Sequence, residues 1–350
     1  ADKNVSLLHA TCLNQDRCRA YLNKRILHKK MSDRSILLLL FLISLQSCSV
    51  FNSGLKTTEK PTDSEMVTSD IDHFYNAFDL AIKDSGKAEQ IFNKYYFKKG
   101  SKGLNDFYKT KIQSKKKFSE FILTFKYYYQ SIRMDITDLK DLENQIKQNF
   151  NDFEKLYPEA KFPDVYFLVG KYQSNGTISK NGLLIGTEML ARTPKSDTAK
   201  WNDDILRISM ERKHIPVTVS HELVHFNQDK MKDGNTLLWK SLREGSAEFI
   251  AELISGETDA NYKKFKGKEL KVWNDFKNDK NKSIWNSWQQ ESKSRPRNAG
   301  YWMGYMICKA YYEKVGDKEK VVKDILSIQD YSQFLKESEV EKYLQNKFGT

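Results

Sequence analysis

The chain has 350 residues, of which 58 are Lys or Arg and 46 are Asp or Glu, so its formal charge is +12. At 39% hydrophobic and 13% aromatic residues it is too apolar for a disordered chain, and its length allows two domains or one large one. The basic excess weakly favours anionic surfaces and does not by itself indicate a nucleic acid partner.

An apolar run near the start is typical of a secreted bacterial lipoprotein. Ile36–Ile43 is too short to span a bilayer and suits the core of a signal peptide. It leads into Leu45–Cys48, which resembles the lipobox where cleavage precedes an acylated Cys. We therefore expect residues 31–47 to be a signal peptide and Cys48 to be the lipid attachment site.

The segments on either side of this leader have different expected roles. Residues 1–30 are an upstream extension, for which two interpretations stay open: an over-extended reading frame or a long basic n-region. We exclude these residues from the fold. Residues 48–69 are rich in Ser, Thr, Gly, Pro and Lys, which favours a flexible tether behind the lipid anchor. The expected location is the bacterial cell envelope, with the outer membrane favoured and the periplasmic and surface faces both open.

Residues 70–158 are expected to form a helical subdomain that frames one side of a cleft. Phe74 and Phe78 recur at helical spacing, as do Phe118 and Ile122. Lys115–Lys117 lies among aromatic residues, a pattern that also occurs in nucleic acid or polysaccharide contacts. We favour an aromatic core with a solvated charged face, and we expect no nucleic acid partner.

The helical period breaks between Phe162 and Leu190. Val165–Val169 and Leu183–Thr187 each have the composition of a buried strand, and Ser174–Thr177 has turn residues between them. We expect these two strands to form a β-hairpin. Two roles stay open for it: a purely structural element, or an edge strand that pairs with extended substrate backbone.

The stretch Val219–Gln228 contains His-Glu-x-x-His, the strongest signal in the chain. On a helix, His221 and His225 share one face and can bind the same zinc ion, while Glu222 can reach the water on that metal. Pro216 suits the first turn of such a helix, and Asp233–Asn235 supplies an expected stop.

A second expected helix follows and ends near Gly256. Glu244, nineteen positions after His225, can complete a His₂Glu site that leaves a fourth position for water. Glu248 lies one turn further on, where it either accepts the free ring N–H of a ligand histidine or is a solvated helix charge. Gly245 is expected to let this helix approach the His-Glu-x-x-His helix closely.

His221–His225 and Glu244–Glu248 together resemble the gluzincin metallopeptidases. More closely, the chain from about Phe162 to Tyr312, including Arg297–Tyr305, resembles the predicted zinc-dependent proteases among bacterial lipoproteins, a group related to the gliding-motility lipoproteins. The resemblance implies a zincin-like catalytic domain over residues 159–350 within an α+β, predominantly helical fold. Arg243 replaces the usual aminopeptidase Asn and the exopeptidase signature Gly-x-Met-x-Asn is absent, so aminopeptidase specificity is not implied.

The expected activity is hydrolysis of a peptide or protein substrate with one Zn²⁺ ion as cofactor. Glu222 would take a proton from the metal-activated water and deliver it to the leaving amine. The oxyanion needs a further donor, for which Tyr301 is the first candidate, followed by Tyr305 and Arg297. Helix packing is an equally weighted role for the two tyrosines. His214 is not expected to be a ligand.

Two other functions stay open. The chain could be a non-catalytic envelope lipoprotein, an assembly component that retains a zincin-like fold with a vestigial or structural zinc site. It could also bind polysaccharide or peptidoglycan through its Trp- and Tyr-rich helices. An intact Glu222 favours catalysis over a structural zinc site, which does not need that residue. The oligomeric state stays open.

Overall fold

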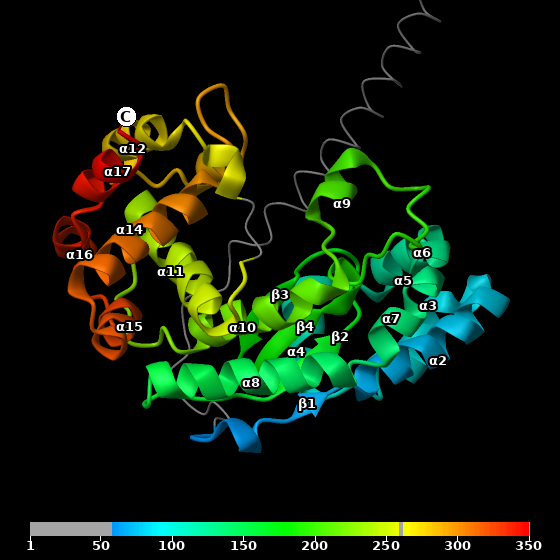
Figure 1. Ribbon diagram of the computed structural model, residues 1–350. Coiled ribbons are helices and arrows are strands. Elements are labelled where there is room, and N and C mark those ends of the chain that lie inside the picture. Colours follow the sequence, from blue (N-terminus) through cyan, green and yellow to red (C-terminus); the bar gives the residue numbers. More distant parts are fainter. Residues whose placement is uncertain (1–57, 259–261, 350) are drawn as a thin grey trace, which may run out of the picture. The chain divides into compact units, whose positions relative to one another are not determined.

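A computed structural model of the chain describes residues 58–258 and 262–349, which form an α+β fold dominated by helices with one four-stranded sheet (Figure 1). The expected upstream extension, the signal peptide and Cys48 lie outside the described residues. In the part of the chain that the structure describes, no helix is both long enough and apolar enough to cross a membrane.

Residues 69–156 are helical, as their spacing predicts. Phe74 packs against Phe92, Phe118 and Tyr129 in an aromatic core, while Lys116 and Lys117 are exposed, so the charged face is solvated. The helices are α2 (Ser69–Lys83), α3 (Ala88–Phe92), α4 (Lys102–Phe107), α5 (Lys115–Thr124), α6 (Lys126–Ser131), α7 (Arg133–Thr137) and α8 (Lys140–Leu156), with π-helical turns η4 (Asn93–Phe97) and η5 (Tyr108–Ile112).

The four strands lie in the order β1-β2-β4-β3. They are β1 (Met66–Val67), β2 (Val165–Leu168), β3 (Gly176–Ser179) and β4 (Gly182–Gly186). β2 and β4 are the two expected strands, but they run parallel instead of forming a hairpin. The hairpin is β3–β4, because the expected turn residues Gly176 and Thr177 belong to a third strand that pairs antiparallel with β4. β3 is an edge strand of this sheet.

The tether expected over residues 48–69 extends too far toward the C-terminus, because residues from Thr58 onward already belong to the fold. Thr58 exchanges backbone hydrogen bonds with Phe162, and η2 (Pro61–Asp63) and β1 follow at once. β1 pairs parallel with β2, so its backbone groups gain partners that sequence composition does not reveal. Any tether lies before Thr58, outside the described residues.

The His-Glu-x-x-His stretch lies on α10 (Ile215–Phe226), which packs against α8, β3, β4 and α11 (Leu237–Ser255) (Figure 1). Pro216 is in the first turn, as expected. The helix ends before the expected stop because the Asn227 side chain donates to the carbonyl oxygens of Leu223 and Lys161. In α11, Thr236 caps the first turn, and Gly256 (φ 76°) ends the helix as expected.

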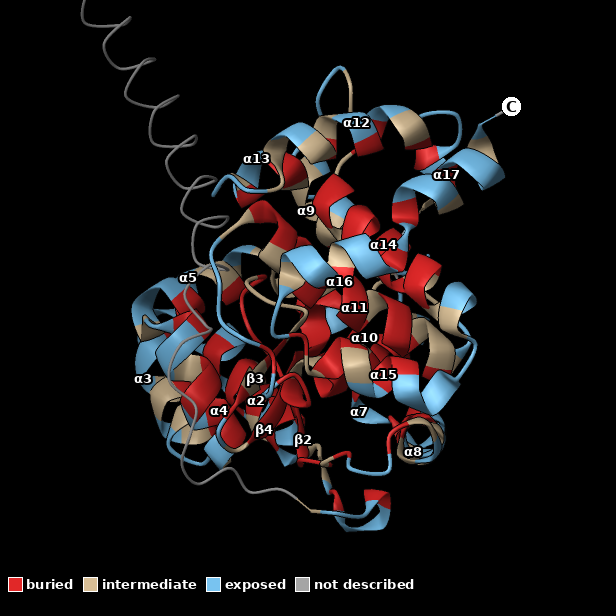
Figure 2. Cartoon of the chain, turned by 90° about the vertical axis from the view of Figure 1, so that its left-hand side faces the viewer, coloured by how far each residue is buried: buried red, intermediate tan, exposed pale blue. Residues whose placement is uncertain are grey.

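The α-helices that follow α11 in the chain pack against α14 (Ala299–Val315), itself one of them, and Figure 2 shows buried residues on both α11 and α14. Residues 262–279 form a 3₁₀ turn followed by a separate helix. The elements before and after α14 are α9 (Asp203–Ile208), η6 (Thr187–Met189), η7 (Arg212–His214), η8 (Tyr262–Phe265), α12 (Glu269–Asp279), α13 (Trp285–Gln289), α15 (Lys318–Leu326), α16 (Tyr331–Ser338) and α17 (Val340–Phe348).

Candidate functional site

His221 and His225 lie one turn apart on the same face of α10. Their ring centroids are 4.6 Å apart and the ring planes are nearly perpendicular, at 82°. Both side chains are largely buried, at 17% and 11% exposed. His214, at the N-terminal cap of α10, is not part of this group.

Glu244 approaches both rings from α11. Its Oε2 lies 3.3 Å from His225 Nε2 and 3.9 Å from His221 Nε2. Of the described residues, these three form the one group whose donor atoms could hold a metal ion, with all three atoms within 4.8 Å of one another. Zinc ligands at about 2.0–2.2 Å in a tetrahedron lie roughly 3.3–3.6 Å apart. The 3.3 Å pair has this spacing, whereas the 3.9 Å pair is wider by a few tenths of an ångström.

Gln228 fixes the orientation and tautomer of His225. The amide nitrogen of Gln228 donates to the Arg243 carbonyl (2.8 Å) and to Ser246 Oγ (2.7 Å). A carbonyl only accepts, so the amide oxygen of Gln228 must be the atom 2.8 Å from His225 Nδ1. Nδ1 therefore carries a proton, which leaves Nε2, 3.3 Å from Glu244 Oε2, as the ring nitrogen available to a metal. Sequence reasoning gave Gln228 no role.

Glu248 lies next to His221, but not in the expected hydrogen bond. Its Oε1 is 3.9 Å from His221 Nδ1, which is too long for a hydrogen bond. Its Oε2 accepts a hydrogen bond from the Thr258 hydroxyl at 3.1 Å. Glu248 is therefore neither a fully solvated helix charge nor, in this arrangement, the acceptor for the ring N–H of His221.

The Glu222 side chain is buried beside the edge strand. A Cβ atom on Gly176 would lie 2.6 Å from Glu222 Cγ and 2.7 Å from Oε1, so the glycine makes room for this carboxylate. Burial raises the pKa of Glu222 to about 7; His221, Lys111 and Arg243 act to lower it, and Glu244 acts to raise it. Sequence reasoning placed Gly176 in a turn and missed this contact.

Glu244 stays ionised despite its burial. Loss of solvation acts to raise its pKa, but Lys240, His225 and His221 together hold the pKa well below its usual range. The phenol of Tyr301, from α14, lies close enough to this carboxylate for Glu244 to act on the Tyr301 pKa. Burial, followed by Glu244 and Glu248, raises the pKa of Tyr301 well above its usual range, so the hydroxyl stays a donor. Among the three oxyanion candidates, Tyr301 is thus placed at the cluster.

The other two oxyanion candidates have different partners. Tyr305 donates to Glu252 Oε2 at 2.5 Å and accepts from Lys309 at 3.1 Å. The pKa of Arg297 is lowered by burial and then by Arg207, so this guanidinium lies near α9. Neither interaction involves the His–Glu cluster.

Gly245 has a different neighbour from the one expected. A Cβ atom on Gly245 would collide with the backbone of Gly304 and Tyr305, and one on Gly304 would collide with the Ser241 carbonyl. The close approach is therefore between α11 and α14, and α10 is not the partner. This crossing brings Tyr301, one turn before Gly304, next to Glu244.

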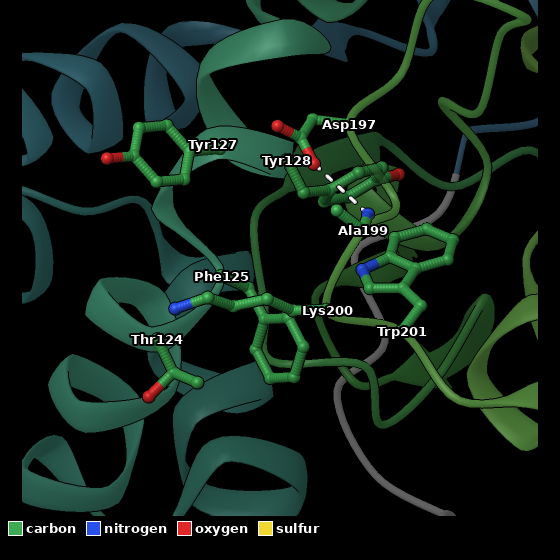
Figure 3. Close-up of a pocket in the computed structure, with 8 residues that line it drawn as sticks. All are labelled: Thr124, Phe125, Tyr127, Tyr128, Asp197, Ala199, Lys200 and Trp201. Carbon is green, nitrogen blue, oxygen red and sulfur yellow. Dashed lines mark hydrogen bonds between the residues drawn. The ribbon is translucent and has the colours of Figure 1, made fainter.

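A separate pocket of about 290 Å³ lies between the α5–α6 junction and the segment after Ser196 (Figure 3). Tyr128 and Trp201 form part of its wall, with ring centroids 4.3 Å apart, and the Asp197 carboxylate accepts a hydrogen bond from Ala199 N at 3.1 Å. None of the His–Glu cluster residues lines it. The lining residues are Thr124, Phe125, Tyr127, Tyr128, Asp197, Ala199, Lys200 and Trp201.

Comparison with known families places the chain in a class of envelope-associated lipoproteins. Residues 56–342 match the family described as gliding motility protein GldB, and this match covers most of the 350-residue chain. The chain therefore belongs to the GldB lipoprotein family of gliding motility proteins. Comparisons with curated proteins and with solved structures found no match.

Proposed function

We propose that this envelope lipoprotein is a zinc-dependent peptidase whose metal is held by His221, His225 and Glu244. The observation that carries the proposal is that their three donor atoms lie within 4.8 Å of one another, with the buried Glu222 carboxylate next to them. A structural zinc site does not need a carboxylate adjacent to its ligands, whereas hydrolysis needs a base within reach of the attacking water.

The proposed roles follow from the surroundings of each side chain. A bound zinc ion would supply an activated water and polarise the scissile carbonyl. Glu222 would take a proton from that water and pass it to the leaving amine. Tyr301 holds an O–H at the cluster that can donate to the developing oxyanion. β3 pairs with β4 on one side, and its other edge carries no described strand, so that edge can pair with extended substrate backbone.

The test compares the full chain with its Glu222→Gln variant. Each protein is loaded with zinc, its zinc content is measured, and cleavage of a fluorescently labelled unstructured protein is followed. We expect Glu222→Gln to keep its zinc and to lose activity by about 10²–10⁴-fold. Glu120→Gln, an exposed change on α5, is the matched control and should be fully active. Cleavage by Glu222→Gln at the wild-type rate would rule out the proposed mechanism.

Family membership favours a second candidate, a non-catalytic component of the envelope. In that case the His–Glu cluster would be vestigial or would hold zinc only for stability. The same experiment separates the two functions. Zinc binding without chelator-sensitive hydrolysis by the wild-type chain would favour the non-catalytic component.

A further inference from the structure

The two carboxylate oxygens of Glu244 have different partners. Oε2 faces the two imidazoles, whereas Oε1 lies 3.2 Å from the ammonium nitrogen of Lys240. Lys240 is one turn earlier on α11, and its side chain is 18% exposed. This pair is therefore largely shielded from solvent, and its attraction is stronger than that of a surface ion pair.

We propose that Lys240 is a positioning residue that holds Oε1 of Glu244, presents Oε2 alone to the metal and weakens the affinity of the site for zinc. The inference rests on the proposed function, because it needs a metal at the His–Glu cluster. It goes beyond that function by naming a residue that sets how tightly and with which oxygen the metal is held.

The charges give the direction of the effect. Without a metal, the ammonium of Lys240 balances the charge of the buried Glu244 carboxylate. Part of the negative charge that would attract zinc is therefore already neutralised. A zinc ion at Oε2 then meets a positive charge on the other oxygen of the same carboxylate, and like charges repel. Because Oε1 is engaged, binding of the metal by both oxygens would require this ion pair to break.

The test measures the zinc dissociation constant of the full chain by competition with a chelator, at one pH. We expect Lys240→Met, which keeps the length but not the charge, to bind zinc about tenfold more tightly than wild type. Lys240→Arg keeps the charge and should stay within about threefold of wild type. Lys320→Met, which breaks an i,i+4 pair with Asp324 on α15, is the matched control and should leave zinc affinity unchanged.

A second measurement, urea unfolding, tests whether Lys240→Met changes the stability of the fold in the expected direction. Metal-free Lys240→Met should unfold at lower urea concentration than metal-free wild type, because Glu244 loses its counter-ion, and zinc should restore more stability to the variant than to wild type. If wild type binds zinc and Lys240→Met binds it equally or more weakly, the role of Lys240 is wrong while the zinc site stands. If wild type takes up no zinc, the proposed function fails, and this inference fails with it.

Discussion

Glu222 lies directly against the backbone of Gly176, with no room for a Cβ atom between the edge strand and the carboxylate. β3 therefore fixes the position of the residue proposed as the general base. The contact joins two elements that are more than forty residues apart in the chain, and it depends on a glycine in the strand.

Gly176→Ala should displace the Glu222 carboxylate without touching the three candidate ligands. We expect zinc content to be unchanged and peptide hydrolysis to fall by about 100-fold, because a shift of roughly 1 Å in a catalytic group costs about that much. Gly86→Ala, where the nearest contact of the new Cβ atom would be an ordinary 3.7 Å, is the control. Unchanged hydrolysis by Gly176→Ala would show that the position of Glu222 is not critical.

Gln228→Leu should weaken metal binding through His225. Leucine removes the acceptor for the Nδ1 proton, so the ring loses both its orientation and its tautomer preference. Losing such a partner typically costs 10–100-fold in metal affinity, and we expect a loss in that range. A zinc titration monitored by chelator competition measures it. Wild-type affinity in Gln228→Leu would contradict the assigned tautomer.

Gly304→Ala should destabilise the crossing of α11 and α14. The added methyl group meets the Ser241 carbonyl and the Gly245 backbone, which cannot turn aside as a side chain would. We expect a loss of at least about 2 kcal/mol in the free energy of unfolding, measured with urea. Gly86→Ala is again the reference. A loss below about 0.5 kcal/mol would mean that the helices can separate at little cost.

Glu188 should make stability depend on pH. Burial raises its pKa to about 7, although its carboxylate accepts backbone N–H groups from Gly170 and Tyr172. Since the pKa is higher in the folded state than the unfolded value near 4.5, the folded chain binds more protons between these limits. Glu188 therefore contributes on the order of 3 kcal/mol to the free energy of unfolding below about pH 4.5, and this contribution is lost as the pH rises through about 7.

Urea unfolding of wild type and Glu188→Gln from pH 4.5 to 8 measures this contribution. The free energy of unfolding of wild type relative to the variant should fall steadily as pH rises, because glutamine does not titrate. A difference that stays constant over this range would show that Glu188 has an ordinary pKa in the folded chain.

The sequence predicted those parts of the candidate site that depend on helical periodicity. His221 and His225 share a face because they are four residues apart, and the structure brings them together with Glu244. The missing parts depend on contacts between distant segments. The Arg243 carbonyl holds the Gln228 amide that orients His225, and Gly176 makes room for the Glu222 side chain. Neither contact has a local sequence signal.

The errors in the predicted fold have the same origin. β2 and β4 have the composition of buried strands, but their parallel pairing depends on β3 lying between them in sequence and beyond β4 in the sheet. Residues 58–69 resemble a tether in composition, and only their pairing with Phe162 and β2 makes them part of the fold. A local pattern does not determine which segment becomes the partner of such a strand.

The central claim is that His221, His225 and Glu244 hold one metal ion, and the most direct test is the zinc content of the purified full chain. Elemental analysis after equilibration with zinc and removal of excess metal should give about one ion per chain in wild type. His225→Ala and Glu244→Ala should each retain less than about a tenth of that. A wild-type chain without zinc, or variants that retain the full wild-type content, would contradict the account.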